Sequence, residues 1–347
     1  MSSLNSLTEL LQESGVKFGF FDMGRHITQL PSNEFAQIEQ GNCIYPSPYL
    51  HQAWLALMLW NPENSEQNIV WFLKFPLDEQ GFLVQAVRDD FINRLMLNIN
   101  QILESADISE AEDALKDNPF SFTPHQEKMA IFHAITAKQT NTPSSQFYQP
   151  CLQYFSGQMP LQHWQELGLQ GIAELAVNIA DHQDMIISHF DQYPDEPLIA
   201  LCNSLEHSKI SEPLSTKIID KLTLSLALEQ PNIALCNALA RATYASSNEN
   251  IKQQAVLMLL HSKLAHSSEV LSTIAIKLSK VLIIPDVCHV FLEKLAISEA
   301  GQQGFSRILA DLMFSEDLRQ AILSAFRNPK RSDELTKAIG SMFGSAF

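Results

Sequence analysis

The stretch FFDMGRHI, residues 20–27, carries the side chains best suited to chemistry. Asp22, Arg25 and His26 bring an acid, a fixed cation and an imidazole within five residues. Such a group could hold or move a proton on a bound molecule, because an imidazole titrates near neutral pH. Asp and Gly are also the residues that a tight turn between two strands favours. We expect a structural turn and keep Asp22, Arg25 and His26 as the only catalytic candidates.

Two nine-residue segments, PLIALCNSL and PNIALCNAL, repeat 34 residues apart and place Cys202 and Cys236 at equivalent positions. Zinc sites gather Cys and His ligands at close spacing, usually as two separated pairs. Each of these thiols stands alone, and helical spacing puts it on the apolar face of its segment. We predict that both cysteines are small core residues and that the chain has no metal site.

Asn203 and Asn237 follow the two cysteines and fall at the edge of the same apolar face. An asparagine there could hydrogen-bond the next repeat and fix the stacking register. It could also hold an extended partner peptide by its backbone amides. Both interpretations stay open, and Asn203 and Asn237 are the candidate partner-binding residues.

Other motifs of ligand or cofactor binding are absent from the sequence. His182 and His189, like His261 and His266, lack a third ligand at suitable spacing. The chain has no Walker loop, no Gly-x-Gly-x-x-Gly fingerprint and no Gly-x-Ser-x-Gly elbow. We therefore predict no cofactor.

The net charge of −16 bears on the choice of partner. Residues 1–159 hold 8 Lys and Arg against 18 Asp and Glu, and residues 160–347 hold 15 against 21. Nucleic acids and anionic membranes attract basic surfaces, so an acidic excess in both halves argues against either partner. We predict a protein or peptide partner with basic character.

Three features bear on location. The densest apolar runs, residues 53–60 and 69–75, fall short of the roughly 20 residues of a membrane-spanning helix. The opening MSSLNSLTELLQESG has neither the basic start nor the apolar run of a secretory signal. Five widely spaced cysteines suit a reducing compartment. We predict a cytoplasmic protein.

Residues 1–105 mix strand and helix signals. VKFGFFDMGRHITQL predicts two short strands that meet around Gly24, which would supply a positive φ. AWLALMLW and NIVWFLKF predict a buried hairpin, and residues 86–104 show apolar positions at helical spacing. We predict a small α+β domain with a mainly antiparallel sheet. A linker region, residues 106–160, follows, with one helix that starts at Pro124.

Residues 161–347 show almost no strand signal. Successive helical segments pair into about five hairpins, whose first helices start roughly 30–37 residues apart. The pattern resembles HEAT- or armadillo-like helical repeats, a resemblance that implies an all-α solenoid. The Trp-Leu-Gly-Tyr-Ala-Pro pattern of tetratricopeptide repeats is absent from the copies.

The whole chain also resembles an uncharacterised family of bacterial proteins of about the same length. The resemblance lies in that length, in the segment KFGFFDMGRHITQLP and in the helical second half, and it implies no mechanism. The expected solenoid predicts a non-enzymatic interaction scaffold or adaptor, because solenoids present extended surfaces. The alternative is an enzyme or small-molecule-binding protein with a site near the turn Asp22–His26 or at the domain junction. A homodimer through AWLALMLW or GSMFGSAF is compatible with either.

Overall fold

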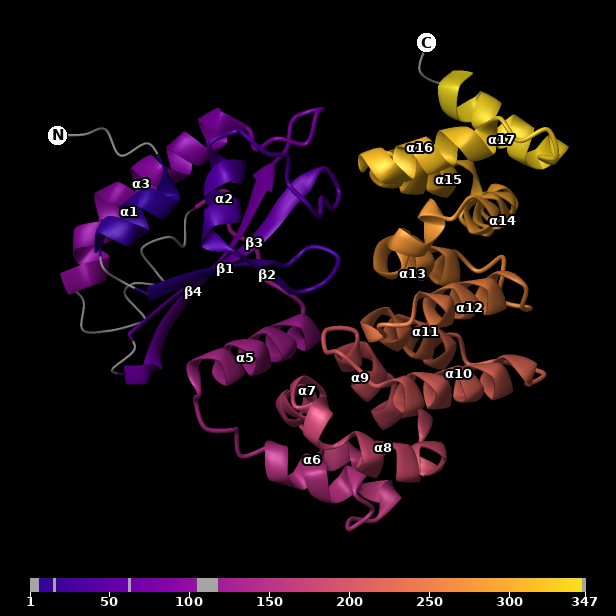
Figure 1. Cartoon of the computed structure of the whole chain (residues 1–347), viewed down its shortest axis with the longest axis horizontal. Coiled ribbons are helices and arrows are strands. Elements are labelled where there is room, and N and C mark those ends of the chain that lie inside the picture. The colour runs from indigo at the N-terminus through magenta and orange to yellow at the C-terminus, as the bar shows by residue number, and fades with distance from the viewer. Residues whose placement is uncertain (1–5, 15–16, 62–63, 105–117, 345–347) are drawn as a thin grey trace. The chain divides into compact units, whose positions relative to one another are not determined.

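The computed structural model describes residues 6–14, 17–61, 64–104 and 118–344 of the chain. The chain divides into two compact units (Figure 1). Unit 1 comprises residues 1–132 and 136–143, and unit 2 comprises residues 133–135 and 144–347. Unit 1 contains a β-sheet, whereas the regular elements described in unit 2 are all helices. An α+β first part followed by a helical second part is therefore confirmed.

The predicted linker region, residues 106–160, contains two helices in its described part. They are α5 (Gln126–Thr140) and α6 (Tyr148–Phe155). The prediction that Pro124 starts a helix is wrong, because His125 still has extended backbone and α5 begins after it. The acidic segment 105–117 lies outside the described residues, and the domain limits at 105 and 160 stay predictions.

Unit 1 is built on a four-stranded antiparallel sheet with the order β2-β1-β3-β4. The strands are β1 (Lys17–Asp22), β2 (Thr28–Leu30), β3 (Gln52–Asn61) and β4 (Asn64–Pro76). The β3–β4 hairpin is the one predicted from the two apolar runs. Because β3 pairs with β1 on one side and with β4 on the other, AWLALMLW lies inside the sheet. Self-association of the chain stays a prediction.

Helices cover both faces of this sheet. On one face, Phe20 of β1 stacks on Phe35 of α2 (Ser32–Glu39) with ring centroids 3.9 Å apart. On the other face, the ring of Phe21 packs edge-on against that of Phe132 in α5, with ring centroids 5.3 Å apart. Adjacent strand residues point to opposite faces, which explains why neighbouring phenylalanines meet different helices. Two further helices are α1 (Leu7–Ser14), against α2, and α3 (Gln85–Glu104), against β4.

A buried carboxylate holds the start of α1. Glu39, at the end of α2, accepts hydrogen bonds from the Leu7 N–H at 2.8 Å and the Thr8 N–H at 3.0 Å. The Ser6 hydroxyl oxygen accepts a third bond, from the Glu9 N–H at 3.1 Å. These bonds satisfy N–H groups that have no partner within the helix, so α1 is fixed to α2 by polar and apolar contacts.

The turn between β1 and β2 differs from the prediction. Gly24 does not adopt a positive φ, and the left-handed non-glycine residues of unit 1 include Leu50 (φ 51°) and His51 (φ 60°). Gly24 is required for space instead, because an added Cβ would lie 3.0 Å from Asp22 Oδ1 and 3.4 Å from the Ser47 carbonyl oxygen. The glycine therefore allows the loop that contains Ser47 to approach the turn closely.

Unit 2 consists of two rows of helices, in which each helix packs against the next member of its own row. The first row contains α7 (Leu169–Val177), α9 (Asp195–Leu205), α11 (Ile233–Ala242), α13 (Ser268–Lys277), α15 (Gly301–Leu312) and α17 (Asp333–Gly344). The second row contains α6, α8 (Gln183–His189), α10 (Glu212–Ala227), α12 (Glu249–Leu260), α14 (Pro285–Ala296) and α16 (Glu316–Phe326). Short 3-10 turns lie between some of them, such as Thr243–Ala245 and Ser279–Ile283.

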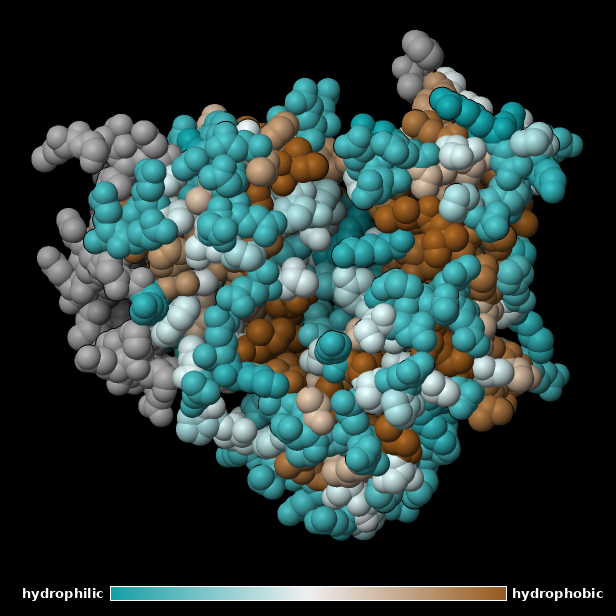
Figure 2. All heavy atoms as spheres, in the orientation of Figure 1, coloured by the Kyte–Doolittle hydropathy of each residue, from teal (hydrophilic) through white to brown (hydrophobic). Residues whose placement is uncertain are grey.

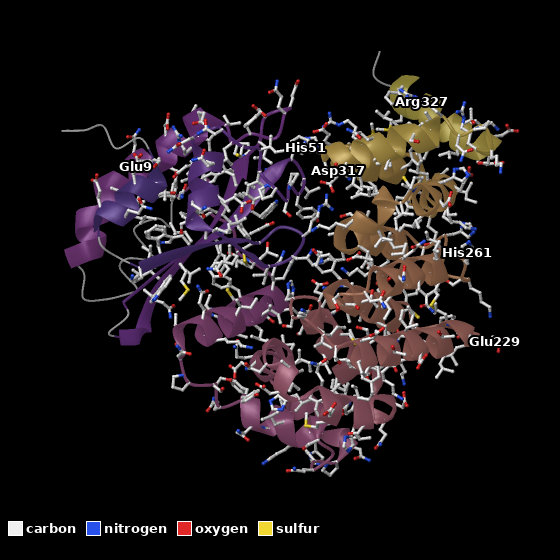
Figure 3. The ribbon with its side chains drawn as sticks, in the orientation of Figure 1. Glu9, His51, Glu229, His261, Asp317 and Arg327 are labelled. Carbon is white, nitrogen blue, oxygen red and sulfur yellow. The ribbon has the colours of Figure 1, made fainter. Side chains whose placement is uncertain are left out.

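The neighbouring second-row helices α10 and α12 run in the same direction. Residues just before α10 and α12, Ile210 and Ser246, form a parallel bridge. At the other ends, the Lys263 ammonium group donates to the Leu228 carbonyl oxygen at 3.4 Å. Figure 3 shows Glu229 and His261 at these neighbouring C-terminal ends. The starts of α10 and α12 consequently lie side by side.

A single apolar cluster runs the length of unit 2 between the two rows. Hydrophilic residues cover most of the face shown in Figure 2, and hydrophobic residues show between them in separate patches. Among the described helices, none combines the length and the apolar composition that crossing a bilayer requires.

Candidate functional site

Asp22 lies at the end of β1 and is 1% exposed. Its Oδ1 accepts a hydrogen bond of 2.6 Å from the Gly24 N–H, which closes the turn. The hydroxyl groups of Tyr45 and Ser47 also hydrogen-bond its carboxyl group, and the Tyr45 hydroxyl is shared with the Trp54 carbonyl oxygen, 3.3 Å away. Burial raises the pKa of Asp22 to about 7, although these hydrogen bonds and the nearby Lys128 ammonium group act against that rise.

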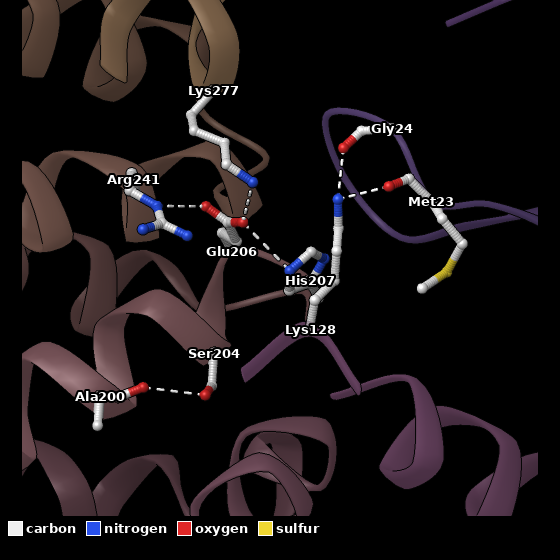
Figure 4. Close-up of polar contacts among 9 residues, drawn as sticks. All are labelled: Met23, Gly24, Lys128, Ala200, Ser204, Glu206, His207, Arg241 and Lys277. Atoms are coloured by element: carbon white, nitrogen blue, oxygen red, sulfur yellow. Dashed lines mark hydrogen bonds and ion pairs between the residues drawn. The ribbon is translucent and has the colours of Figure 1, made fainter. Parts of the chain in front are cut away.

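Lys128 of α5 fixes the same turn from another direction. Its ammonium group donates to the carbonyl oxygens of Met23 and Gly24, each at 2.5 Å (Figure 4). Two carbonyl acceptors on consecutive residues hold the turn in one conformation. The carboxylate of Asp22 and the ammonium group of Lys128 therefore bind the same few residues of backbone.

The other two predicted residues of the turn are also largely buried, with Arg25 9% exposed and His26 8% exposed. The Arg25 Nε donates to the Pro48 carbonyl oxygen at 3.2 Å, and its guanidinium group lies 5.5 Å from the centre of the Tyr49 ring. The structure thus places Asp22, Arg25 and His26 on one turn, where Asp22 and Arg25 bind the loop of residues 45–51. Catalysis at this turn stays a prediction.

The cysteines of the repeated segment are core residues, as predicted. Cys202 in α9 and Cys236 in α11 are fully buried in the apolar cluster of unit 2. Burial raises the pKa of the Cys202 thiol to about 12 and that of Cys236 to about 11. Both side chains are therefore neutral thiols at neutral pH, which suits packing and not nucleophilic chemistry.

Asn203 and Asn237 occupy equivalent positions on α9 and α11, which pack against each other. The Asn237 Nδ2 donates to Glu269 Oε1 of α13 at 3.0 Å, so this side chain bonds the next first-row helix. The Oδ1 atoms of both asparagines are buried, and no donor among the described residues reaches them. Asn237 thus makes one hydrogen bond of the kind expected between neighbouring repeats, and partner binding by either residue stays a prediction.

Unit 2 contains a charged network that spans three first-row helices. The carboxylate of Glu206, with no exposed side-chain surface, lies 2.7 Å from Arg241 Nε and 2.7 Å from Lys277 Nζ (Figure 4). The Nε2 of the buried His207 imidazole lies 3.1 Å from the same carboxylate. Glu206 is the C-cap residue just after α9, Arg241 lies in the last turn of α11, and Lys277 ends α13.

The charges of this network depend on one another. Burial by itself would raise the pKa of Glu206, but Lys277, His207 and Arg241 together hold it well below its usual value. Glu206 is therefore ionised at neutral pH and is the common acceptor for two cationic side chains. Since those side chains come from the ends of successive helices, the network fixes the position of each helix relative to the next.

Two open hollows on the surface of unit 2 are lined by other residues than the asparagines and the Glu206 network. One, of about 420 Å³, is lined by side chains of α12 and the adjoining His261. The other, of about 520 Å³, is lined by the first half of α10 and Ile187. Within the described part of the chain, no three His, Cys, Asp or Glu side chains form a group that could hold a metal ion.

These features define a class of protein: an α+β unit joined to a longer unit of helices stacked in two rows. A family model described as "Protein of unknown function (DUF3549)" matches residues 2–343, nearly the whole chain. The chain belongs to this family. No curated protein and no solved structure matches it significantly.

Sequence reasoning missed the Glu206 network, although the sequence carries a signal of it. Arg241 follows Glu206 by 35 residues, and Lys277 follows Arg241 by 36, which is close to the 34-residue interval of the repeated segment. Charged residues at nearly the same place in three consecutive repeats, next to apolar positions, predict contact between neighbouring helices.

Proposed function

We propose that unit 2 is a HEAT-like solenoid and that the protein is a non-enzymatic scaffold or adaptor for a basic protein partner. The proposal rests on the starts of five consecutive second-row helices. Each carries at least one exposed acidic residue in its first turn: Asp184, Glu212, Glu249, Asp286, and Glu316 with Asp317. We call these six residues the acidic row.

The acidic row has the arrangement that recognition of an extended basic partner requires. At least along α8, α10 and α12, adjacent helix starts are joined by hydrogen bonds. The Ser211 N–H donates to Gln183 Oε1 at 2.5 Å, and Asn248 Nδ2 donates to Glu212 Oε1 at 3.4 Å. Carboxylates in the first turn also stabilise their helices, so they carry charge at little cost in stability. Repeated negative charge along such a line attracts and orients a cationic chain.

Asn203 and Asn237 supply the second kind of contact in this proposal. Their Oδ1 atoms are acceptors without a donor among the described residues. Backbone N–H groups of an extended peptide are donors of the required kind. Charge then selects the partner, and the amide contacts form only once the side chains that bury these Oδ1 atoms move aside. The excess of acidic residues and the five free cysteines support a cytoplasmic protein that does not bind nucleic acid.

Reversing the charge of the acidic row is expected to abolish partner binding. The variant carries Glu212→Lys, Glu249→Lys and Asp286→Lys. A control with two charge reversals carries Glu229→Lys and Glu299→Lys, and it is compared with the double variant Glu212→Lys, Glu249→Lys as well; Glu229 and Glu299 are exposed residues just beyond the C-terminal ends of α10 and α14. The unmodified chain and each variant are used as bait in native lysate at low and at high salt. The recovered proteins are quantified by mass spectrometry.

The proposal expects one stoichiometric basic protein with the unmodified chain and with the control variant. Its recovery should fall at least tenfold with the acidic-row variant and should also fall with salt, because exposed charges are screened. Equal recovery with both variants, or no stoichiometric protein under gentle conditions, would contradict it. Circular dichroism of each variant establishes that unit 2 remains folded.

A further inference from the structure

We propose that Asp22 is a proton-controlled lock that decides how firmly the loop of residues 45–51 is held on the turn of residues 23–27. This inference concerns unit 1 and does not rest on the scaffold proposal. It combines a buried carboxyl group that is shared by two segments with a strained backbone beside it.

Several contacts join the loop to the turn, and Asp22 takes part in two of them. Asp22 binds the turn through the Gly24 N–H and hydrogen-bonds the hydroxyl groups of Tyr45 and Ser47 in the loop, and Arg25 Nε of the turn donates to the Pro48 carbonyl oxygen of the loop. The other charged or titratable groups around it are Lys128 from α5, which binds the turn, and Arg25 and His26 on the turn itself. Opening the loop would bring water to a carboxyl group that is now 1% exposed.

The loop stores conformational strain next to this contact. Leu50 and His51 are consecutive, neither is glycine, and both have left-handed backbone, with φ of 51° and 60°. Side chains make that conformation unfavourable, so it persists only where surrounding contacts impose it. Here the Trp54 indole Nε1–H donates to the Tyr49 carbonyl oxygen at 2.8 Å, and the Leu77 N–H donates to the His51 carbonyl oxygen at 3.0 Å. A loop under strain is a suitable element for a two-state lock.

Protonation of Asp22 favours the closed loop. In the closed loop burial raises the pKa of this carboxyl group to about 7, whereas in water its ordinary value is 3.8. A group with a raised pKa in the closed state stabilises that state at low pH, and the contribution is lost as the pH rises through about 7. The opening equilibrium therefore increases about tenfold per pH unit between about pH 4 and pH 7 and is constant above that.

Hydrogen exchange of the Trp54 indole N–H tests the lock, because its acceptor is the loop residue Tyr49. Exchange is measured by NMR on the whole chain from pH 5 to pH 8 and is expressed as a protection factor, which removes the pH dependence of free exchange. Protection should fall by about tenfold from pH 5 to pH 6 and level off above pH 7. In Asp22→Asn, which keeps a carbonyl acceptor for the Gly24 N–H, protection should not depend on pH.

Asp78→Asn is the matched control. Asp78 is an exposed turn residue of unit 1 that accepts the Gln80 and Phe82 N–H groups at 2.9 Å and 3.0 Å. This variant should show the same pH dependence as the unmodified chain. A pH-independent unmodified chain, or an unchanged pH dependence in Asp22→Asn, would overturn the proposal. Should Asp22→Asn not fold, the carboxyl carbon of Asp22 is titrated by NMR in the unmodified chain, and a midpoint near 3.8 overturns it.

Discussion

Replacing Glu206 with glutamine is expected to lower the free energy of unfolding of unit 2 by about 3–5 kcal/mol. The substitution keeps the size of the side chain but removes the one carboxylate that Arg241 and Lys277 share. Those side chains are only 21% and 17% exposed, so water replaces the lost charge poorly. Urea unfolding measures the loss, and hydrogen exchange of α9, α11 and α13 assigns it to this unit.

The control is Glu249→Gln, which removes an ion pair with Lys252 in which the carboxylate is 77% exposed. This change should cost at most about 1 kcal/mol. The two proteins should also differ in their response to acid. Because the pKa of Glu206 is lowered in the fold, its contribution is present above the usual value of 4.5 and is lost as the pH falls below it. If Glu206→Gln and Glu249→Gln lowered the free energy of unfolding equally, the network would not hold the helices together.

Gly171→Ala is expected to lower the free energy of unfolding by about 3 kcal/mol, because it overpacks the contact between α6 and α7. A Cβ on Gly171 would overlap the Phe147 carbonyl oxygen and would lie 2.7 Å from the Cys151 sulfur atom. Real Cβ atoms do not approach so closely, so α7 would have to move away from α6. Thermal unfolding of the variant should show a clearly lower midpoint than that of the unmodified chain.

Gly340→Ala provides the comparison for this second prediction. Gly340 lies in α17, and among the described residues no atom outside the adjacent backbone of this helix is within 4 Å of the position that its Cβ would take. Alanine should therefore stabilise the helix by about 0.5–1 kcal/mol, because glycine loses more backbone entropy. If Gly171→Ala were also neutral or stabilising, the close approach of α6 and α7 would be refuted.

Much of the fold follows from local sequence patterns. The runs around residues 53–60 and 69–75 are apolar enough to specify a buried hairpin, and the structure pairs them as β3 and β4. Helical spacing after residue 86 likewise corresponds to α3. The error at Gly24 has a physical cause: sequence alone shows a glycine in a turn, but it does not show that Ser47 and Tyr49 pack on it.

The two copies of the repeated segment show the limit of pattern reasoning. Pro197 lies in the first turn of α9, whereas Pro231 precedes α11, whose N-cap is Asn232. The prolines of the two copies therefore occupy different positions relative to the start of their helices. The burial of Cys202 and Cys236 could be predicted, since helical spacing puts both on the apolar face.

The candidate site residues were less predictable than the fold. Asp22, Arg25 and His26 are visible in the sequence, but their contacts come from Tyr45, Ser47, Pro48 and Lys128 in other segments. Equally, the partners of Glu206 become evident only when three helices are stacked. The acidic row requires knowledge of where each helix begins and which helices are neighbours.

The central claim, that the acidic row binds a basic partner, is tested most directly by cross-linking the recovered complex with a carbodiimide. This reagent joins carboxylates to lysine amines in direct contact, and mass spectrometry identifies the joined residues. The account predicts that lysines of the partner are linked to Glu212, Glu249 and Asp286. Links confined to Glu229, Glu299 or unit 1 would contradict it.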